Sequence, residues 1–304
     1  MSKAAMRGPQ ALGEAGPADL AKAVKDAARE LGADLVGLAD PALLAGEPEQ
    51  KRPQAIFPEV QTVVVLGRRI TRGTLRGIEE GTNWKAYECF GRRYLEDQFL
   101  ARTVFEVVAY LEDIGYEAVP LFGYPKDLKE MGAQVRPGQP APNVIPDVRV
   151  AAAAAGLGEV GLLGDFITPD FGPLQKLSLI LTDAPMAFDK PRRFGFCQGC
   201  QACVAACPLA AADAGRQNVV QRGGQTWNEL ALDEARCALC ANGAAKSRFP
   251  GSKEVERIPA ACGRACLASL EARGLLTRKF HHAFRVRQPW SVDAFGAVNS
   301  GGRM

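Results

Sequence analysis

The chain has 304 residues, of which 47% are hydrophobic, and a formal net charge of +3. A chain this long can bury a sizeable core and is expected to contain more than one folding unit. The small net charge excludes an argument for nucleic-acid binding from charge alone, and no apolar run reaches the length of a membrane span. Residues 1–17 lack the apolar segment and the twin arginine of export signals, which predicts a cytoplasmic protein.

The first part of the chain alternates between helical and strand-like patterns. Residues 1–16 are small and rich in Gly and Pro, which predicts disorder. The predicted elements that follow are a helix at 17–32, strands at 34–39 and 62–67, a helix at 83–114 and a strand at 118–122. This order predicts a mixed α/β layered structure.

Two stretches between these elements are candidates for ligand binding. Four arginines follow the strand at 62–67 on a predicted loop and could grip phosphates or carboxylates, although clustered charge more often lies solvated on a surface. They are Arg68, Arg69, Arg72 and Arg76. Residues 123–146 lack periodicity, and so long a stretch predicts a lid or binding loop, with an ordinary surface excursion as the alternative.

A glycine-rich stretch at 156–173 follows an alanine-rich helical pattern at 147–155. Its first six residues spell G-x-G-x-x-G, but a dinucleotide-binding turn must follow a strand and open a helix. Here a helix comes first, so we interpret the glycines as positions where the backbone closely approaches a large flat ligand. A strand at 176–182 then leads to the cysteine-rich region.

Eight of the nine cysteines have the spacing of iron–sulfur ligands. Residues 197–208 spell C-x2-C-x2-C-x3-C-P, the run of two-cluster ferredoxins, and two cysteine pairs follow. Such ferredoxins exchange the fourth ligand between clusters, which assigns Cys197, Cys200, Cys203 and Cys266 to one [4Fe–4S] cluster and Cys207, Cys237, Cys240 and Cys262 to the other. Zinc would need only four ligands, and a disulfide framework suits small secreted chains. Cys89 is left over and is expected to pack as a small apolar residue.

On these residues the chain resembles the corrinoid iron–sulfur reductases, the family of epoxyqueuosine reductases and reductive dehalogenases. The resemblance rests on A-G-L-G-E-V-G-L-L-G-D-F-I-T-P-D-F-G-P at 155–173, on L-T-D-A-P at 181–185 and on the cysteine run. It implies a nitroreductase-like three-layer α/β domain at 17–190 that holds cobalamin and the substrate. A ferredoxin-like module with two [4Fe–4S] clusters is implied at 191–270, and a basic extension with a mobile tail at 271–304. The residues implied to line the corrinoid are Gly156, Gly158, Gly161, Gly164, Thr168, Pro169 and Gly172.

The activity implied by the resemblance is reductive cleavage of a carbon–heteroatom or carbon–halogen bond in a small-molecule or nucleoside-type substrate. Electrons from a donor such as ferredoxin or flavodoxin would pass through both clusters to the corrinoid, with no membrane partner. tRNA is the less favoured substrate, because no helical-repeat region follows the cysteines. Since reductive cleavage leaves basic charge, a nearby acid is needed. The candidates are Tyr87, Tyr124 and Asp147, although a tyrosine is more often core or rim and an aspartate before a helix is more often its N-cap.

Two other functions stay open at this point. One is a corrinoid-free electron-transfer protein that reactivates a partner enzyme, with the basic C-terminal stretch docking an acidic surface. The other keeps the α/β domain but fills it with flavin. Two adjacent histidines, His281 and His282, lie in that basic stretch, and adjacent residues do not share a face, so they are not expected to form a metal pair.

Overall fold

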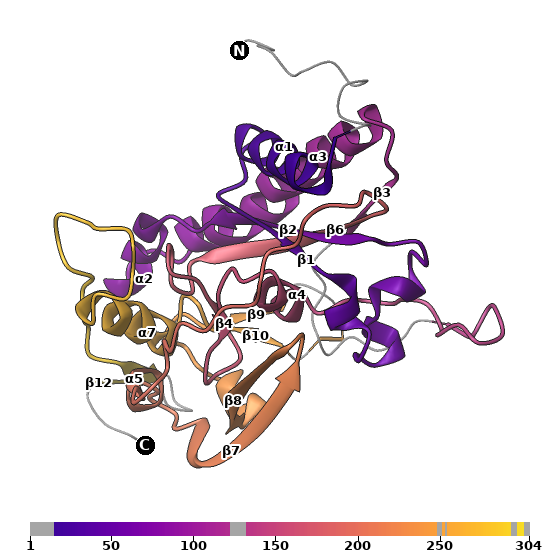
Figure 1. Ribbon diagram of the computed structural model, residues 1–304. Coiled ribbons are helices and arrows are strands. Elements are labelled where there is room, and N and C mark those ends of the chain that lie inside the picture. The colour runs from indigo at the N-terminus through magenta and orange to yellow at the C-terminus, as the bar shows by residue number, and fades with distance from the viewer. Residues whose placement is uncertain (1–14, 122–131, 248–250, 253, 293–296, 301–304) are drawn as a thin grey trace.

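The computed structural model describes residues 15–121, 132–247, 251–252, 254–292 and 297–300 (Figure 1). A four-stranded antiparallel sheet lies at the centre of its first part, with the strand order β1-β2-β6-β3. Its strands are β1 (Leu35–Ala39), β2 (Thr62–Arg69), β6 (Gln175–Thr182) and β3 (Ala118–Leu121). Residues 62–67 are an unbroken apolar run in place of an alternation, which is typical of a strand covered on both faces.

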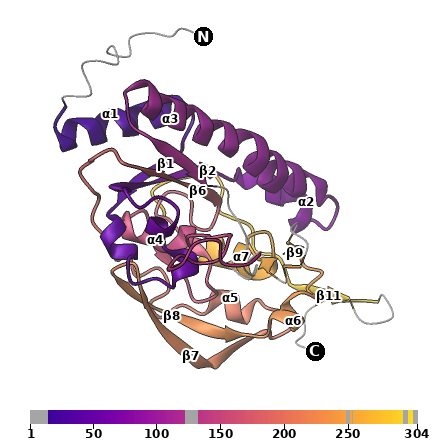
Figure 2. The ribbon, with the colours of Figure 1, turned by 90° about the vertical axis from the view of Figure 1, so that its right-hand side faces the viewer.

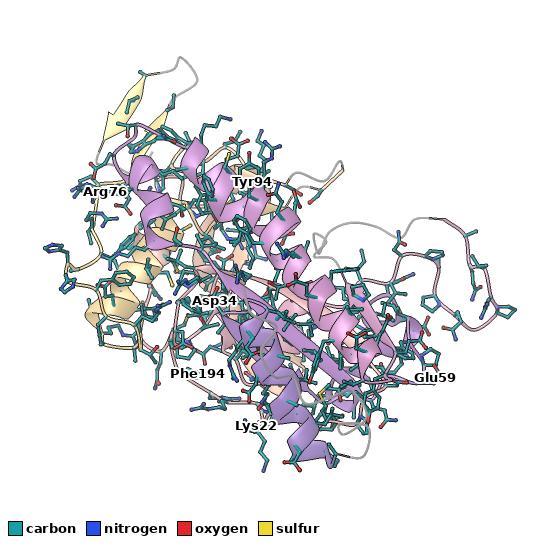
Figure 3. The ribbon with its side chains drawn as sticks, turned by 90° about the horizontal axis from the view of Figure 1, so that it is seen from above. Lys22, Asp34, Glu59, Arg76, Tyr94 and Phe194 are labelled. Carbon is teal, nitrogen blue, oxygen red and sulfur yellow. The ribbon has the colours of Figure 1, made fainter. Side chains whose placement is uncertain are left out.

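Helices cover both faces of this sheet, so the mixed α/β class is confirmed (Figures 1 and 2). Val64 and Leu66 point to α1 (Pro17–Glu30) and α3 (Ala101–Asp113), while Val63 and Val65 point to the alanines of α4 (Val148–Ala154). Figure 3 views the first of these layers from above, with Lys22 on α1 and Tyr94 on the long helix. The alternation of the strand thus divides the core into two clusters, one on each side of the sheet.

The helix predicted at 83–114 is present but irregular. Two segments of π-helical turns, Tyr87–Arg93 and Leu95–Leu100, run directly into α3. The arginines predicted on a loop lie instead on regular structure, because Arg68 and Arg69 end β2, Arg72 begins a 3-10 turn (Arg72–Leu75) and Arg76 begins α2 (Arg76–Glu79). Other 3-10 turns are Pro41–Leu44, Glu49–Lys51 and Pro53–Ala55.

The second part of the structure carries the cysteines on short elements around a long hairpin. The hairpin pairs β7 (Ala212–Arg222) with β8 (Gln225–Leu232) through a turn at Gly223 and Gly224, whose φ angles are 57° and 72°. Both angles are positive, as a two-residue hairpin turn requires. The short elements are β4 (Glu159–Val160), β5 (Phe166–Ile167), α5 (Ala202–Ala205), α6 (Glu234–Cys237), β9 (Ala245–Lys246) and β10 (Val255–Glu256).

The C-terminal part differs from the prediction in two places. The helix expected after Cys266 is α7 (Ala261–Ala272), which begins earlier and contains both Cys262 and Cys266. Part of the predicted mobile tail is paired, because β11 (Trp290–Val292) and β12 (Val298–Ser300) form an antiparallel pair. Within the described ranges, no helix combines the length and the apolar character that crossing a membrane would need.

Candidate iron–sulfur centre and buried ionic network

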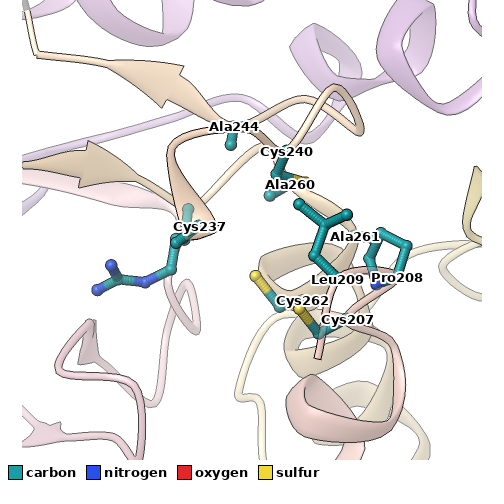
Figure 4. A pocket seen from close by; sticks show the side chains of 10 residues that line it. Cys207, Pro208, Leu209, Cys237, Cys240, Ala244, Ala260, Ala261 and Cys262 are labelled. Carbon is teal, nitrogen blue, oxygen red and sulfur yellow. The ribbon is translucent and has the colours of Figure 1, made fainter. Parts of the chain in front are cut away.

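Four cysteines meet at one small cavity beside α7 (Figure 4). Cys207 ends the first cysteine run, Cys237 and Cys240 lie at the end of α6 and in the turn after it, and Cys262 lies in α7. Cys237 and Cys262 are buried. These four are the residues that the ligand exchange of two-cluster ferredoxins assigns to one cluster.

The other four cysteines gather one turn further along α7, where Cys266 lies on that helix, Cys203 on α5, and Cys197 and Cys200 in the turn before α5. Burial and the neighbouring Cys197, Cys203 and Cys200 hold the pKa of Cys266 well above the usual value of a thiol. Burial together with Cys197 and Cys200 raises the pKa of Cys203 to about 12. Cys197 and Cys266 also pack against the same apolar cluster, and Cys200 Sγ lies 3.3 Å from the hydroxyl of Ser269 on α7, so these four cysteines form a second group.

The position of α7 separates the two groups. Cys262 and Cys266 are four residues apart on α7, which is a rise of about 6 Å along a helix axis. Each of them faces a different group of three cysteines. One helix therefore supplies the last cysteine of both groups.

Partly buried hydrogen bonds hold the turn that carries the first cysteine run. The carboxylate of Glu159, in the glycine-rich stretch, accepts from the backbone N–H groups of Phe194, Gly195 and Phe196 at 2.9, 3.1 and 2.6 Å. Arg273 of the C-terminal stretch donates to the carbonyl of Phe196 at 2.7 Å. The sequence did not reveal these anchors, because they join segments that are far apart along the chain.

The donor set suits an iron–sulfur cluster better than a single zinc ion. Both groups consist of sulfur alone, which is the ligand type of zinc and iron–sulfur sites. In the described part of the chain, no three His, Cys, Asp or Glu side chains are close enough to hold one ion. Zinc needs its four ligands on one ion, whereas a cubane spreads four thiolates over its irons.

A buried cation lies beside the group that contains Cys237 and Cys262. Burial alone would lower the pKa of Arg257, but Asp165, Cys237 and Cys262 raise it, so its guanidinium stays charged.

Tyr87 lies in a buried ionic network outside these groups. Its side chain is 2% exposed, and its hydroxyl donates to Glu256 Oε1 at 2.5 Å. The same carboxylate lies 2.7 Å from Lys176 Nζ and 3.3 Å from Arg92 Nε, and Lys176 also lies 2.8 Å from Glu96. The phenol, the π-helical turns, β6 and β10 are thereby tied together.

The network fixes the protonation states of its members. Burial and the Glu256 carboxylate raise the pKa of Tyr87 well above its usual value, so the phenol keeps its proton. Burial would lower the pKa of Lys176, but Glu256 and Glu96 raise it. Burial would raise the pKa of Glu256, but Lys176, Tyr87 and Arg92 lower it. A protonated phenol therefore stands next to an ionised pair.

Asp147 is the N-cap of α4. Its carboxylate accepts from the backbone N–H of Arg149 at 3.1 Å, from Arg149 Nη2 at 2.8 Å and from Arg222 Nη1 at 3.1 Å. Burial would raise its pKa, but Arg149 and Arg222 hold the pKa well below the usual range. A carboxylate stabilised this strongly holds no proton near neutral pH, so the structure favours the capping role over that of a proton donor.

Replacing Asp147 by asparagine is expected to lower the free energy of unfolding by about 3 kcal/mol at pH 7, because Arg149 and Arg222 lose a buried partner. The pKa of Asp147 is lowered in the folded state, so its contribution is complete above the unfolded value of about 3.9 and is lost as the pH falls below it. Urea unfolding of both proteins from pH 7 to pH 3 measures this, and the difference should shrink toward pH 3. The half-buried partner of exposed Arg102 gives the control, since Glu106→Gln should change stability by less than about 1 kcal/mol.

The glycines of the candidate corrinoid loop pack against the chain's own backbone. A Cβ atom would lie 2.2 Å from Lys190 O at Gly156 and 2.0 Å from Ile167 O at Gly158. At Gly161 it would lie 3.4 Å from Cys197 Sγ, so the loop borders the cysteine run. These contacts within the protein require glycine at those positions whether or not a ligand binds. As predicted, the loop follows a helix, α4, and not a strand.

The other residues of that loop are held by hydrogen bonds within the protein. Thr168 is fully buried and its hydroxyl lies 3.0 Å from Gln175 Oε1, while the carbonyl of Pro169 accepts from the backbone of Thr277. Gly164 and Gly172 have φ angles of 78° and 60°, which favour glycine. Their assignment to a corrinoid-lining loop stays a prediction. Tyr124 and the first part of the predicted lid lie outside the described residues.

A cavity of about 280 Å³ lies between the end of β2 and α7. This volume is slightly below the roughly 300–1,000 Å³ of pockets for drug-sized ligands, and a corrinoid is larger than such ligands. The cavity therefore does not fit a corrinoid, although it could hold a small molecule.

The chain is similar to known reductases. No family model matches it. It is 27% identical to a tetrachloroethene reductive dehalogenase of Dehalobacter restrictus over 241 residues, which are 64% of this chain and 38% of that protein. Over 60 residues, 20% of this chain and 18% of that protein, it is 43% identical to an epoxyqueuosine reductase of Synechococcus.

Among solved structures, the catabolic reductive dehalogenase NpRdhA matches with a TM-score of 0.55 and 25% identity, covering 83% of this chain and 32% of that chain. A reductive dehalogenase whose structure suggests a mechanism for B12-dependent dehalogenation matches with the same TM-score. These relatives confirm the predicted resemblance to reductive dehalogenases and epoxyqueuosine reductases. The chain spans well under half the length of the reductive dehalogenases it matches.

Proposed function

We propose that the protein is an iron–sulfur oxidoreductase that passes electrons through two [4Fe–4S] clusters to the reductive cleavage of a small-molecule or nucleoside-type substrate. The observation that carries the proposal is the division of eight cysteines into two groups of four, each combining separate motifs. Nine thiols without disulfide partners also suit a reducing compartment, so we propose that the protein is cytoplasmic. We also propose that residues 17–190 form a nitroreductase-like domain and residues 191–270 a ferredoxin-like module.

The cysteines would hold the clusters, and the clusters would supply one-electron transfer. Cys197, Cys200, Cys203 and Cys266 would bind one cluster, and Cys207, Cys237, Cys240 and Cys262 the other. The surrounding chain excludes water and positions the ligands. Glu159 and Arg273 fix the first cysteine turn, and the hydroxyl of Ser269 lies 3.3 Å from Cys200 Sγ.

We also propose cobalamin as the group at which the substrate reacts, supported by the similarity to a reductive dehalogenase connected with B12-dependent dehalogenation. Bound cobalamin would supply the reductive chemistry. The cavity of about 280 Å³ at the end of β2 is too small to be its site.

Tyr87 is the proposed proton donor. Its phenol is protonated, and Glu256 with Lys176 holds it in place. Tyr87→Phe removes only the hydroxyl, so turnover is expected to fall by about 10²- to 10⁴-fold while iron content stays unchanged. Steady-state rates with a reductant in excess, together with iron analysis, measure this. Unchanged turnover in Tyr87→Phe would show that Tyr87 is not the proton donor.

An acidic electron donor, such as ferredoxin or flavodoxin, is the proposed partner. Residues 190–212 and 272–292 contain no Asp or Glu, and Arg273 joins these two segments next to the first cysteine turn. A basic surface around an electron-entry site speeds association with an acidic protein and is screened by salt. tRNA, the less favoured substrate, would meet the same surface.

Reversing the charge of exposed Arg192 and Arg193 to glutamate is expected to slow reduction by flavodoxin about tenfold or more at low salt. Reduction by methyl viologen should not change, because a small donor needs no docking surface. The matched control reverses Arg29 and Arg102, which are exposed on the helical layer across the sheet. An equal loss in the control, or no loss in the test variant, would contradict docking at this surface.

Metal analysis tests the proposed function directly. Protein purified without oxygen and incubated with hydroxocobalamin should contain about eight irons and one cobalt per chain. Eight irons without cobalt would favour the second candidate, a corrinoid-free electron-transfer protein. A flavin absorption spectrum would instead identify the third alternative. About four irons would show that one cysteine group binds no cluster.

A further inference from the structure

The cavity of about 280 Å³ is formed by four segments that lie far apart in the sequence. They are residues 69–72 at the end of β2, residues 170–174 at the end of the glycine-rich stretch, α7, and residues 276–280. The first and last belong to the two arginine-rich stretches, at 68–76 and 273–287. Neither the cluster ligands nor the proposed proton donor uses this cavity, which leaves its role open.

The floor of the cavity is apolar. Four aliphatic side chains on it are at most 7% exposed, and the rings of Phe171 and Phe280 stand among them. The four are Ile70, Leu174, Leu267 and Leu276. Such a surface favours a ligand with an apolar body, because binding removes that body from water.

The carboxylates at the cavity already have partners. Glu271 lies 3.4 Å from Arg72, whose guanidinium also stacks over Phe280 at 4.4 Å from the ring centroid. Asp170 accepts a hydrogen bond from the hydroxyl of Thr277. These contacts hold the walls in place and leave neither carboxylate without a partner.

The arginines at the rim of the cavity have fewer polar partners than the carboxylates have. The guanidinium of Arg278 lies over the ring of Phe171 at 5.2 Å from the centroid and has no carboxylate partner among the described residues. Arg69 is 43% exposed, and its Nε lies 3.5 Å from Asp34, which is outside the cavity. The rim therefore offers guanidinium groups, whose fork geometry matches a carboxylate.

We propose that this cavity binds a small apolar acid, a carboxylate carried on one or two aromatic rings. The rings would rest on the leucine floor, and the carboxylate would meet Arg278 and Arg69. The cavity volume limits the size of the ligand, and the apolar floor favours a ligand with an apolar body. Three arginines and two carboxylates, which already have partners, line the cavity, so it favours a negatively charged ligand. The site goes beyond the proposed function, because binding there requires neither clusters nor corrinoid.

Isothermal titration of the full chain with 1-naphthoate tests the site. Arg278→Ala is expected to weaken binding about tenfold, since one charge-assisted hydrogen bond is lost, and Leu276→Trp is expected to abolish it by filling the cavity. Arg278 is exposed, so its replacement should leave the fold intact, as a thermal unfolding curve would verify. Arg102→Ala, on the distant α3, is the matched control and should bind like the unchanged protein.

Three results would overturn the proposal. The first is no binding of 1-naphthoate, or binding that neither cavity variant weakens. The second is equal affinity for 1-naphthamide, the neutral analogue, because the arginines would then contribute nothing. The third is loss of 1-naphthoate binding when hydroxocobalamin is present, because the cavity would then be part of a corrinoid site.

Discussion

Replacing Cys262 by alanine is expected to reduce the iron content from about eight to about four atoms per chain. Cys262 lines the cavity that Cys207, Cys237 and Cys240 share, and it is buried, so no water molecule can easily take its place. The cluster of the other group should remain, because its own ligand on α7 is Cys266. Iron and sulfide analysis with low-temperature electron paramagnetic resonance of the reduced protein measures the loss.

Two further variants make this result specific. Cys266→Ala should also lose about four irons, but the resonance that remains should differ from that of Cys262→Ala, because the other cluster survives. Cys89→Ala is the control, since Cys89 is half-buried and belongs to neither group, and it should keep all its iron. Loss of iron from Cys89→Ala, or full iron in Cys262→Ala, would contradict the assignment.

Replacing Lys176 by methionine is expected to lower the free energy of unfolding by about 3–5 kcal/mol. Lys176 bridges Glu256 and Glu96. Met keeps the length of the side chain but removes its charge, so the two half-buried carboxylates lose a cationic partner. Urea unfolding at pH 7 measures the effect. A change below about 1 kcal/mol, the size typical of exposed pairs, would show that the network contributes little to stability.

The pH dependence of the unfolding free energy and a double variant test whether the loss in Lys176→Met comes from the missing charge. The pKa of Lys176 is raised, so its contribution is complete below the unfolded value of about 10.4 and is lost only at higher pH. The pKa of Glu256 is lowered, so its contribution is present above about 4.3 and is lost as the pH falls. The difference between the two proteins should therefore be constant from about pH 5 to pH 9. Lys176→Met combined with Glu256→Gln should recover part of the loss, because the buried charge is removed.

Most strands of the central sheet could be predicted from the sequence, because each coincides with a short apolar run. The expected strands at 34–39, 62–67 and 176–182 correspond to β1, β2 and β6 within two residues. The β7–β8 hairpin was missed, although its signal is local. Gly223-Gly224 between two strand-like runs is a typical two-residue turn, and β8 alternates between buried Trp227 and exposed Asn228.

The site was predictable only where its residues follow a spacing rule. The cysteine spacing gave the two groups in advance, because the ligand exchange of ferredoxins depends on the order of motifs along the chain. The network of Tyr87, Lys176 and Glu256 joins residues that are 80 or more positions apart, and no local pattern records such a pairing. The cavity at the end of β2 was missed as a cavity for the same reason, since four distant segments form it.

The β7–β8 hairpin also affects how cysteines of one group find each other during folding. Cys207 and Cys237 lie on either side of it, and the hairpin closes at its base through the pairing of Ala212 with Leu232. Hairpins form within about 1–10 μs, and the closure entropy of a loop grows with the length that remains free. Once the hairpin has formed, only a few residues separate each cysteine from its base. Formation of this hairpin therefore brings these two thiols toward each other through local contacts alone.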